Sequence, residues 1–234
     1  MPLIFDGHLD LAMNALGYER DQRLPVAQMR QFESAARDDG RETPTVSLSA
    51  MRGAGVAMCL ATVIARTKPV KPQRGATRRD LDYPTQDMAH AAAAGQLAYY
   101  EQLQRQSEVT LIRDAAALDA HWARWRDASS GGQDLPIGII VTMEGADPIV
   151  EPDELYGWHE RGVRTLMLSH TADSPYAYGT PPWDAQESVP GAQQGPLTDK
   201  GRALLDHMSD LAMPLDLTHL CDASFFEAVD RFDG

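Results

Sequence analysis

Short runs of apolar residues recur along the chain and are separated by more polar segments. Five such runs predict β-strands, at residues 3–9, 55–64, 137–143, 163–169 and 213–218. Each run is apolar enough for a strand that is covered on both faces, as in the parallel sheets of α/β proteins.

The segments between and after these runs have the periodicity and start signals of amphipathic helices. Helices are predicted at residues 83–105, 114–126, 153–161, 198–211 and 222–231. Alternation of strands and helices is typical of βα units around a parallel sheet. We therefore expect an α/β fold.

Composition narrows the choice of partners. The chain has 234 residues, 43% of them hydrophobic, which is enough for one sizeable core. Its 21 Lys and Arg stand against 34 Asp and Glu, giving a formal net charge of -13. Such a chain repels phosphate backbones and anionic membrane surfaces, so neither nucleic acid nor a membrane is an expected partner. Self-association into a homo-oligomer stays open.

The two cysteines, Cys59 and Cys221, lie in or beside apolar runs and belong to no CxxC framework. They are interpreted as free thiols, which suit a reducing compartment. The first residues contain no signal-peptide pattern, and no window reaches the roughly 18 apolar residues of a membrane span. These features predict a cytoplasmic protein.

Polar residues stand at the ends of four apolar runs, where the strands of a barrel carry their chemistry. In the first run, His8 and Asp10 share one face of the strand. Ionisable groups buried there are costly unless they are paired or bound to metal, so both are candidate ligands. Three later runs are followed by Glu144, His170 and His219.

A histidine or aspartate at the end of one strand is more often a cap or a turn residue than a ligand. Several strand ends in the same register are different, because a group of unpaired buried charges is not tolerated without a cation. Imidazole and carboxylate donors favour zinc. Asp216, just before His219, either orients a ligand imidazole or bonds to a backbone amide; both roles stay open.

Several motifs together resemble the membrane dipeptidase (renal dipeptidase) family. Asp6-Gly-His-Leu-Asp10 is similar to the DGHxD opening of that family, and Met143-Glu-Gly145 to its strand-end glutamate. Two further stretches, residues 162–170 and residues 195–202 followed by 216–219, resemble the segments that carry a substrate-contacting histidine and a metal-binding histidine. Their order and spacing hold over essentially the whole chain.

This resemblance implies a TIM-type (β/α)8 metallohydrolase barrel with two zinc ions. His8 and Asp10 would bind one ion and His219 the other, with Glu144 bridging them. The implied reaction is the hydrolysis of dipeptides, including those with a D-configured carboxyl-terminal residue, by a metal-bridging hydroxide. His170 would contact the scissile carbonyl, which makes Glu144 and His170 the expected catalytic residues.

The chain departs from the family pattern by stopping at Gly234, before a second zinc-binding histidine, a late aspartate and a substrate-contacting arginine. We therefore expect residues 1–234 to form a single barrel domain that is incomplete at its C-terminus, with about five of eight βα units. Expressed alone, these residues are expected to be inactive and to hold the second metal poorly.

Two other functions are compatible with these residues. One is a different barrel metallohydrolase, such as an amidase or a lactonase, because metal ligands specify water activation more strongly than they specify the acyl group. The other is a non-catalytic metal-binding or scaffold protein, which applies if the chain is natively this short. Substrate profiling separates the first from a dipeptidase, and the intact mass of the native protein tests the second.

Overall fold

The computed structural model describes residues 2–34, 43–67, 81–128, 132–171, 173–180 and 195–233. These residues form two compact units, each built from two segments of the chain. Unit 1 consists of Met1–Thr62 and Gln96–Val141, and unit 2 of Val63–Gly95 and Thr142–Gly234.

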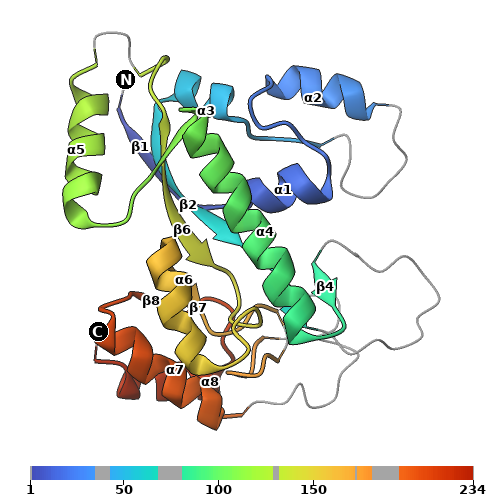
Figure 1. The fold of residues 1–234 in the computed structure, drawn as a ribbon, viewed down its shortest axis with the longest axis vertical. Helices are drawn as coiled ribbons and strands as arrows, with labels where there is room; N and C mark the ends of the chain where they lie inside the picture. The colour runs from blue at the N-terminus through green and yellow to red at the C-terminus, as the bar shows by residue number, and fades with distance from the viewer. Residues whose placement is uncertain are drawn as a thin grey trace. The chain divides into compact units, whose positions relative to one another are not determined.

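Unit 1 contains strands in the order β1-β2-β6-β5. Their bounds are β1 Ile4–Leu9, β2 Val56–Val63, β5 Val109–Leu111 and β6 Ile137–Met143, of which the last residue of β2 and the last two of β6 belong to unit 2. β1 is parallel to β2, and β5 is parallel to β6. The helices of this unit are α1 Leu11–Gly17, α2 Val26–Glu33, α3 Leu48–Ala54, α5 Ala115–Arg126 and the second half of α4 Gln86–Arg105 (Figure 1).

Tyr100, on α4, connects a helix and a strand inside the core of unit 1. Its side chain is fully buried. The hydroxyl donates a hydrogen bond to the carbonyl of Thr62 at 2.7 Å and accepts one from the amide of Ala12 at 3.0 Å. Because both polar partners are buried, this hydroxyl satisfies them where water is excluded and fixes the start of α1 near the end of β2.

Unit 2 contains the end of β6 followed by β7 Val163–Met167 and β8 Leu215–Asp216, in the order β6-β7-β8. A separate parallel pair is formed by β3 Arg66–Thr67 and β4 Asp82–Tyr83. The helices are the first half of α4, the 3-10 helix Pro152–Glu154, α6 Leu155–Arg161, α7 Asp199–Asp210 and α8 Asp222–Arg231. α6, α7 and α8 lie together near the C-terminus (Figure 1).

Ion pairs join α7 to α8. Arg202 on α7 contacts Glu227 on α8 at 2.7 Å, and Arg231 on α8 contacts Asp206 on α7 at 2.9 Å. The start of α7 is fixed by Thr198, whose side chain accepts the amide hydrogen of Gly201 as an N-cap. Among the described residues, the helices are each too short or too polar to cross a bilayer.

All five predicted strands are present, and the strand at residues 137–143 has the predicted bounds. The predicted strand at 213–218 is reduced to β8, which has two residues. The expectation that every strand is covered on both faces is wrong for β1, where Ile4 and Phe5 are 42% and 45% exposed. β1 is also an edge strand, with β2 as its one hydrogen-bonded neighbour among the described strands.

The five predicted helices are present with ends that differ by a few residues. Three short helices were not predicted, namely α1, α2 and α3, and neither were the strands β3, β4 and β5. Each of these elements has eight residues or fewer. Segments of that length carry at most about two helical turns of periodic pattern.

The packing of α7 predicts opposite effects for two glycine substitutions. A Cβ atom at Gly201 would lie 2.0 Å from the carbonyl oxygen of Tyr176, whereas one at Gly157 on α6 has nothing within 4 Å. Gly201→Ala is expected to lower the free energy of unfolding by roughly 3 kcal/mol, as overpacking against backbone does. Gly157→Ala is expected to raise it by up to about 1 kcal/mol through helix propensity.

Equilibrium denaturation of both variants beside the wild type measures these changes. Equal effects of the two substitutions, or a neutral Gly201→Ala, would contradict the close approach of Gly201 to the Tyr176 backbone.

Candidate metal centre

Glu144 follows directly after β6, at the point where the chain turns sharply. Its backbone amide donates to the carbonyl of Val63 at 3.0 Å, which continues the strand pairing by one residue. Gly145 then adopts φ +90°, a left-handed conformation that favours glycine. The turn leaves the Glu144 side chain 5% exposed.

Two histidines of unit 2 face this carboxylate. His170 lies three residues after β7, and His219 lies three residues after β8. His219 has φ +71°, which is unusual for a residue with a side chain. Its carbonyl accepts hydrogen bonds from the amide of Thr180 at 2.7 Å and from the Thr180 hydroxyl at 3.3 Å, and these bonds hold the backbone in that conformation.

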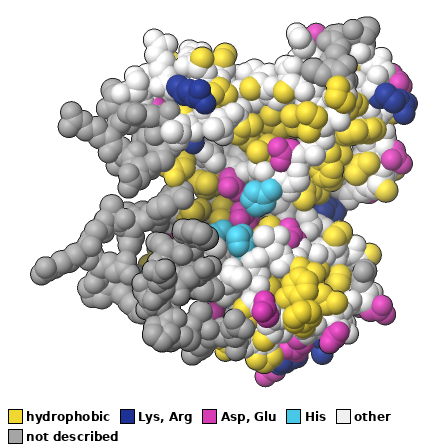
Figure 2. Space-filling view, turned by 180° about the vertical axis from the view of Figure 1, so that it is seen from behind, with side chains coloured by type: hydrophobic (Ala, Val, Ile, Leu, Met, Phe, Trp, Pro, Cys, Tyr) yellow, Lys and Arg dark blue, Asp and Glu magenta, His cyan; other side chains and the backbone are white. Residues whose placement is uncertain are grey.

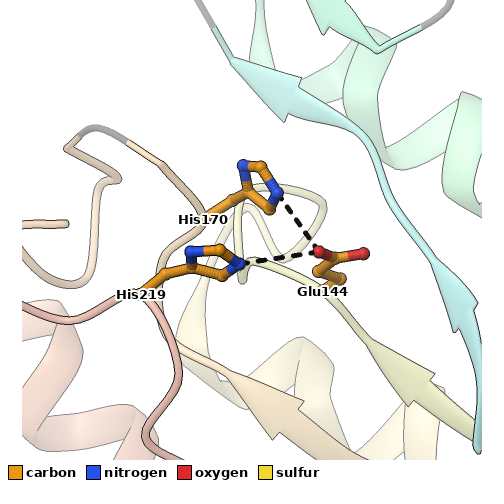
Figure 3. A group of neighbouring side chains, drawn as sticks. All are labelled: Glu144, His170 and His219. Carbon is orange, nitrogen blue, oxygen red and sulfur yellow. Dashed lines mark ion pairs between the residues drawn. The ribbon is translucent and has the colours of Figure 1, made fainter. Parts of the chain in front are cut away.

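The three side chains converge on one point (Figure 3). His170 Nε2 lies 3.1 Å and His219 Nε2 lies 3.8 Å from Glu144 Oε1. The two imidazole rings are 4.4 Å apart between centroids. His170 and His219 keep 17% and 26% of their side chains exposed. These exposed fractions show that solvent can reach the cluster. On the face shown in Figure 2, histidine side chains reach the surface beside acidic ones.

This donor set fits a zinc ion. One ligand atom from each of Glu144, His170 and His219 lies within 4.8 Å of the others. Ligands bound at about 2.0–2.2 Å to one tetrahedral zinc are about 3–4 Å apart, so small side-chain movements suffice. A buried carboxylate also gains from a cation, because its charge has lost the hydration of bulk water.

His8 and Asp10 lie together in unit 1, at the end of β1. His8 Nε2 is 3.5 Å from Asp10 Oδ1, and the hydroxyl of Thr62 donates to the same Asp10 oxygen at 2.5 Å. The two side chains are 41% and 30% exposed, so the expectation of buried groups on this strand is wrong. They line a cleft of about 180 Å³ together with Asn14 and Arg20.

Arg20 is held rigidly beside this cleft. It forms a two-pronged ion pair with Glu33, with N–O distances of 2.7 and 3.0 Å, and both side chains are buried. It also donates to the side-chain oxygen of Asn14, whose amide in turn donates to the carbonyl of Asp10. These bonds fix the backbone that carries Asp10.

Two charged residues beside His170, Arg66 and Asp147, belong to no recognisable sequence motif. Arg66 Nη1 lies 3.2 Å from His170 Nδ1. Asp147 Oδ1 accepts the backbone amide of Thr67 at 2.7 Å. Burial raises the pKa of the Asp147 carboxyl to about 6, although the Thr67 amide and the positive charge of Arg66 act in the opposite direction.

The structure decides two of the questions that the sequence raised. Asp216 accepts hydrogen bonds from the amide and the hydroxyl of Thr218, at 2.9 and 2.5 Å, which is the backbone role of the two alternatives. Cys59 and Cys221 are both buried free thiols, as predicted. Burial raises the pKa of the Cys59 thiol, so it stays protonated and poorly nucleophilic.

Comparison with known proteins places these residues in context. The sequence model of the membrane dipeptidase family, peptidase family M19, matches residues 2–231. No curated protein matches the chain.

Solved structures share the fold at low sequence identity. A metallopeptidase described as the dipeptidase AC of family M19 is 22% identical, with a TM-score of 0.68 over 99% of this chain and 62% of that one. A Rhodobacter sphaeroides metallopeptidase, bound to a phosphinate mimic of the dipeptide L-Ala-D-Ala, is 22% identical, with a TM-score of 0.67 over 99% and 63%. A probable dipeptidase from Pseudomonas aeruginosa is 16% identical, with a TM-score of 0.65 over 98% and 50%.

These matches confirm the predicted family resemblance and the predicted fold class, an α/β fold that corresponds to part of a TIM-type metallohydrolase barrel. The chain spans less than two thirds of the length of the first two structures, 62% and 63%.

The raised pKa of Asp147 predicts a pH-dependent stability. Its pKa is about 6 in the folded chain and about 3.9 when unfolded, so the folded state binds the proton more tightly. The contribution of Asp147 to the free energy of unfolding is fully present below pH 4 and is lost as the pH rises through 6. The loss is about 3 kcal/mol at most. Asp147→Asn keeps an acceptor for the Thr67 amide and is expected to flatten that dependence.

Denaturation of the metal-free protein in chelator, between pH 4 and 7, tests this expectation. Asp206→Asn is the matched control, because that carboxylate is exposed and pairs with Arg231 at the surface. An unchanged slope in Asp147→Asn would show that another group causes the loss of stability.

Proposed function

The chain belongs to the membrane dipeptidase family, and from this premise we propose that the protein hydrolyses dipeptides with the help of two zinc ions. The observation that carries the proposal is the convergence of Glu144, His170 and His219 from separate strand ends of unit 2. These three groups are costly to assemble for stability alone, and the Glu144 carboxylate and the His219 imidazole match the donors that zinc prefers.

Four residues are proposed as the metal ligands present in this chain. His8 and Asp10 would bind one ion, His219 the other, and Glu144 both. Glu144 suits the shared position because a carboxylate offers two oxygens, whereas an imidazole nitrogen offers one lone pair. Bound zinc would lower the pKa of a coordinated water so that the water can attack a carbonyl near neutral pH.

His170 is proposed as the group that stabilises charge on the substrate. When water adds to the carbonyl of a peptide bond, negative charge develops on the carbonyl oxygen. A hydrogen-bond donor already held in place stabilises that charge without reorganising during the reaction. The His170 side chain is 17% exposed, so its ring is accessible to a small substrate yet restrained by its neighbours.

A dipeptide is proposed as the substrate, including one with a D-configured carboxyl-terminal residue. The support is the family match and the similar Rhodobacter sphaeroides metallopeptidase, which binds a mimic of L-Ala-D-Ala. An amidase or lactonase would use similar metal ligands, so a panel of dipeptides, simple amides and lactones distinguishes the substrate class.

We also propose a cytoplasmic location. The support is that Cys59 and Cys221 are free thiols, a state that a reducing compartment maintains. Localisation of the tagged whole protein by fractionation tests this.

The bridging role of Glu144 predicts a severe effect of Glu144→Gln, which keeps the shape of the side chain but removes its charge. In the whole protein, this substitution is expected to lower the bound zinc from two ions per chain and to remove most dipeptidase activity. Metal analysis of the purified protein and a dipeptide assay measure both effects.

Glu151→Gln is the matched control, because Glu151 lies in the same unit and pairs with Lys200 at the surface. It should leave metal content and activity unchanged. Full activity in Glu144→Gln, or no more than one metal ion in the intact wild type, would exclude a bridging carboxylate.

The donor role of His170 predicts a different outcome for His170→Ala. Metal content should stay near that of the wild type, while turnover falls on the order of a hundredfold through loss of one oxyanion-stabilising donor. Loss of metal would instead identify His170 as a ligand, and wild-type turnover would remove it from the site.

A further inference from the structure

Arg66 approaches the candidate metal centre from β3 and is held on its other side by Asp82. Its Nε and Nη2 atoms both lie 2.8 Å from Asp82 Oδ1. The two residues are also register partners in the β3–β4 pair. The Arg66 side chain is 14% exposed and that of Asp82 is 22% exposed. An ion pair this sheltered is screened little by solvent and keeps the guanidinium in one orientation.

The backbone around Arg66 is anchored as well. Its amide donates to the carbonyl of Leu81 at 2.7 Å, which joins β3 to the residue before β4. The next amide, that of Thr67, donates to Asp147 at 2.7 Å. Asp147 is buried and follows Glu144 by three residues. β3 is therefore tied to the same turn that presents the central carboxylate.

The free edge of the guanidinium faces the ring of His170. Arg66 Nη1 lies 3.2 Å from His170 Nδ1. A guanidinium has N–H donors and no acceptor, and it stays charged. The contact with Arg66 favours a lone pair on Nδ1, because a proton on Nδ1 would lie beside another donor. In a neutral imidazole, this leaves the proton on Nε2.

Thr171 is compatible with the same arrangement. Its hydroxyl oxygen lies 2.8 Å from His170 Nδ1 and accepts a hydrogen bond from Arg66 Nη1 at 3.2 Å. The hydroxyl can donate its own hydrogen to Nδ1 while its oxygen accepts from Arg66. Arg66 can only donate to Nδ1, and the Thr171 hydroxyl is compatible with the tautomer that this donor favours.

We propose that Arg66, clamped by Asp82, is a positioning residue that holds His170 in the Nε2–H tautomer, so that His170 acts as a hydrogen-bond donor and not as a metal ligand. The assignment of that donor to the substrate rests on the proposed function; the tautomer does not. It follows from contacts on the Nδ1 side of the ring.

The two histidines then have different roles at the same carboxylate. His170 Nε2 lies 3.1 Å from Glu144 Oε1, a distance at which an N–H donates a hydrogen bond, and a substrate carbonyl would replace that carboxylate as the acceptor of the same N–H. His219 Nε2 lies 3.8 Å from the same oxygen, which is too long for a hydrogen bond and leaves room for an ion between the two atoms. The contact with Arg66 thus explains why the similar side chains of His170 and His219 have different roles.

A direct test is the tautomeric state of His170, measured by 15N NMR of the whole protein labelled at histidine. The two ring nitrogens of a neutral imidazole differ strongly in 15N shift according to which one carries the proton, and His170→Ala identifies the signal. The metal-free wild type is expected to show Nε2–H. A proton on Nδ1 in the wild type would overturn the proposal without any further variant.

The variant Arg66→Met removes the donors and keeps the length of the side chain. The His170 signal is expected to lose its single Nε2–H form, and kcat to fall about ten- to a hundredfold with unchanged KM and zinc content. Arg66→Lys, which keeps a cation and a donor, should restore part of the loss. Arg202→Met is the matched control, because it removes a similar ion pair, with Glu227 between α7 and α8.

A double substitution shows whether Arg66 acts through His170. In a His170→Ala background, Arg66→Met should lower kcat no further, since the group that it positions is already absent. Multiplied losses would mean that Arg66 acts independently of His170, which overturns the proposal. If Arg66→Met does not fold, Asp82→Asn loosens the same clamp and is expected to give the same spectral change and the same non-additivity.

The NMR measurement also separates this proposal from the proposed function. If no variant and no wild-type sample cleaves dipeptides, the proposed function fails, while the tautomer of His170 in wild type and Arg66→Met still decides the role of Arg66. Retention of the pure Nε2–H form in both Arg66→Met and Asp82→Asn would show that the clamp is not needed.

Discussion

Burial of the Glu144 carboxylate is the constraint on which the arrangement of unit 2 depends. Its side chain is 5% exposed, and a charge that has lost its water needs donors or a cation within contact distance. The backbone around Glu144 adopts conformations that bring hydrogen-bond donors and possible metal ligands close to this carboxylate. Gly145 turns the chain at φ +90°, and His219 adopts φ +71°. A left-handed conformation at a non-glycine residue costs about 1–3 kcal/mol, and the hydrogen bonds from Thr180 to the His219 carbonyl help to offset that cost.

The sequence predicts those strands and helices in which one feature of the residue pattern, such as an apolar run or a helical periodicity, is strong. Residues 137–143 form a mostly apolar run between Pro136 and Glu144, and the observed strand has those bounds. The long helix α4 and the capped helix α7 are equally clear. Short elements such as β5, with three residues, have no periodicity of their own and exist because a neighbouring strand pairs with them. The exposure of β1 depends on which strands and helices surround it, and a local pattern does not contain that information.

The residues of the candidate site also differ in whether the sequence predicts them. Glu144, His170 and His219 are detectable in the sequence because each follows an apolar run, and strand ends are where an α/β fold gathers its polar groups. Arg66 has no such signal. It lies in a strand of two residues whose partner, Asp82, is sixteen residues away, so their ion pair exists only after the chain has folded. Residues that bind substrate or metal recur in motifs, whereas residues that orient them are found by distance.

The surroundings of His170 matter because a neutral imidazole can carry its proton on either ring nitrogen, and the neighbouring groups determine which one. A hydrolytic site needs both kinds of nitrogen, lone pairs to hold a cation and N–H groups to stabilise an oxyanion. Two histidines whose rings lie 4.4 Å apart could exchange these roles if nothing distinguished them. The guanidinium of Arg66 distinguishes them at little entropic cost, since it is already fixed by Asp82 and cannot accept a hydrogen bond. A lysine at this position would orient His170 less well. Its single ammonium group on a flexible chain cannot bind a carboxylate and an imidazole at the same time in one plane. An arginine is therefore favoured at position 66, because it gives His170 and His219 different roles.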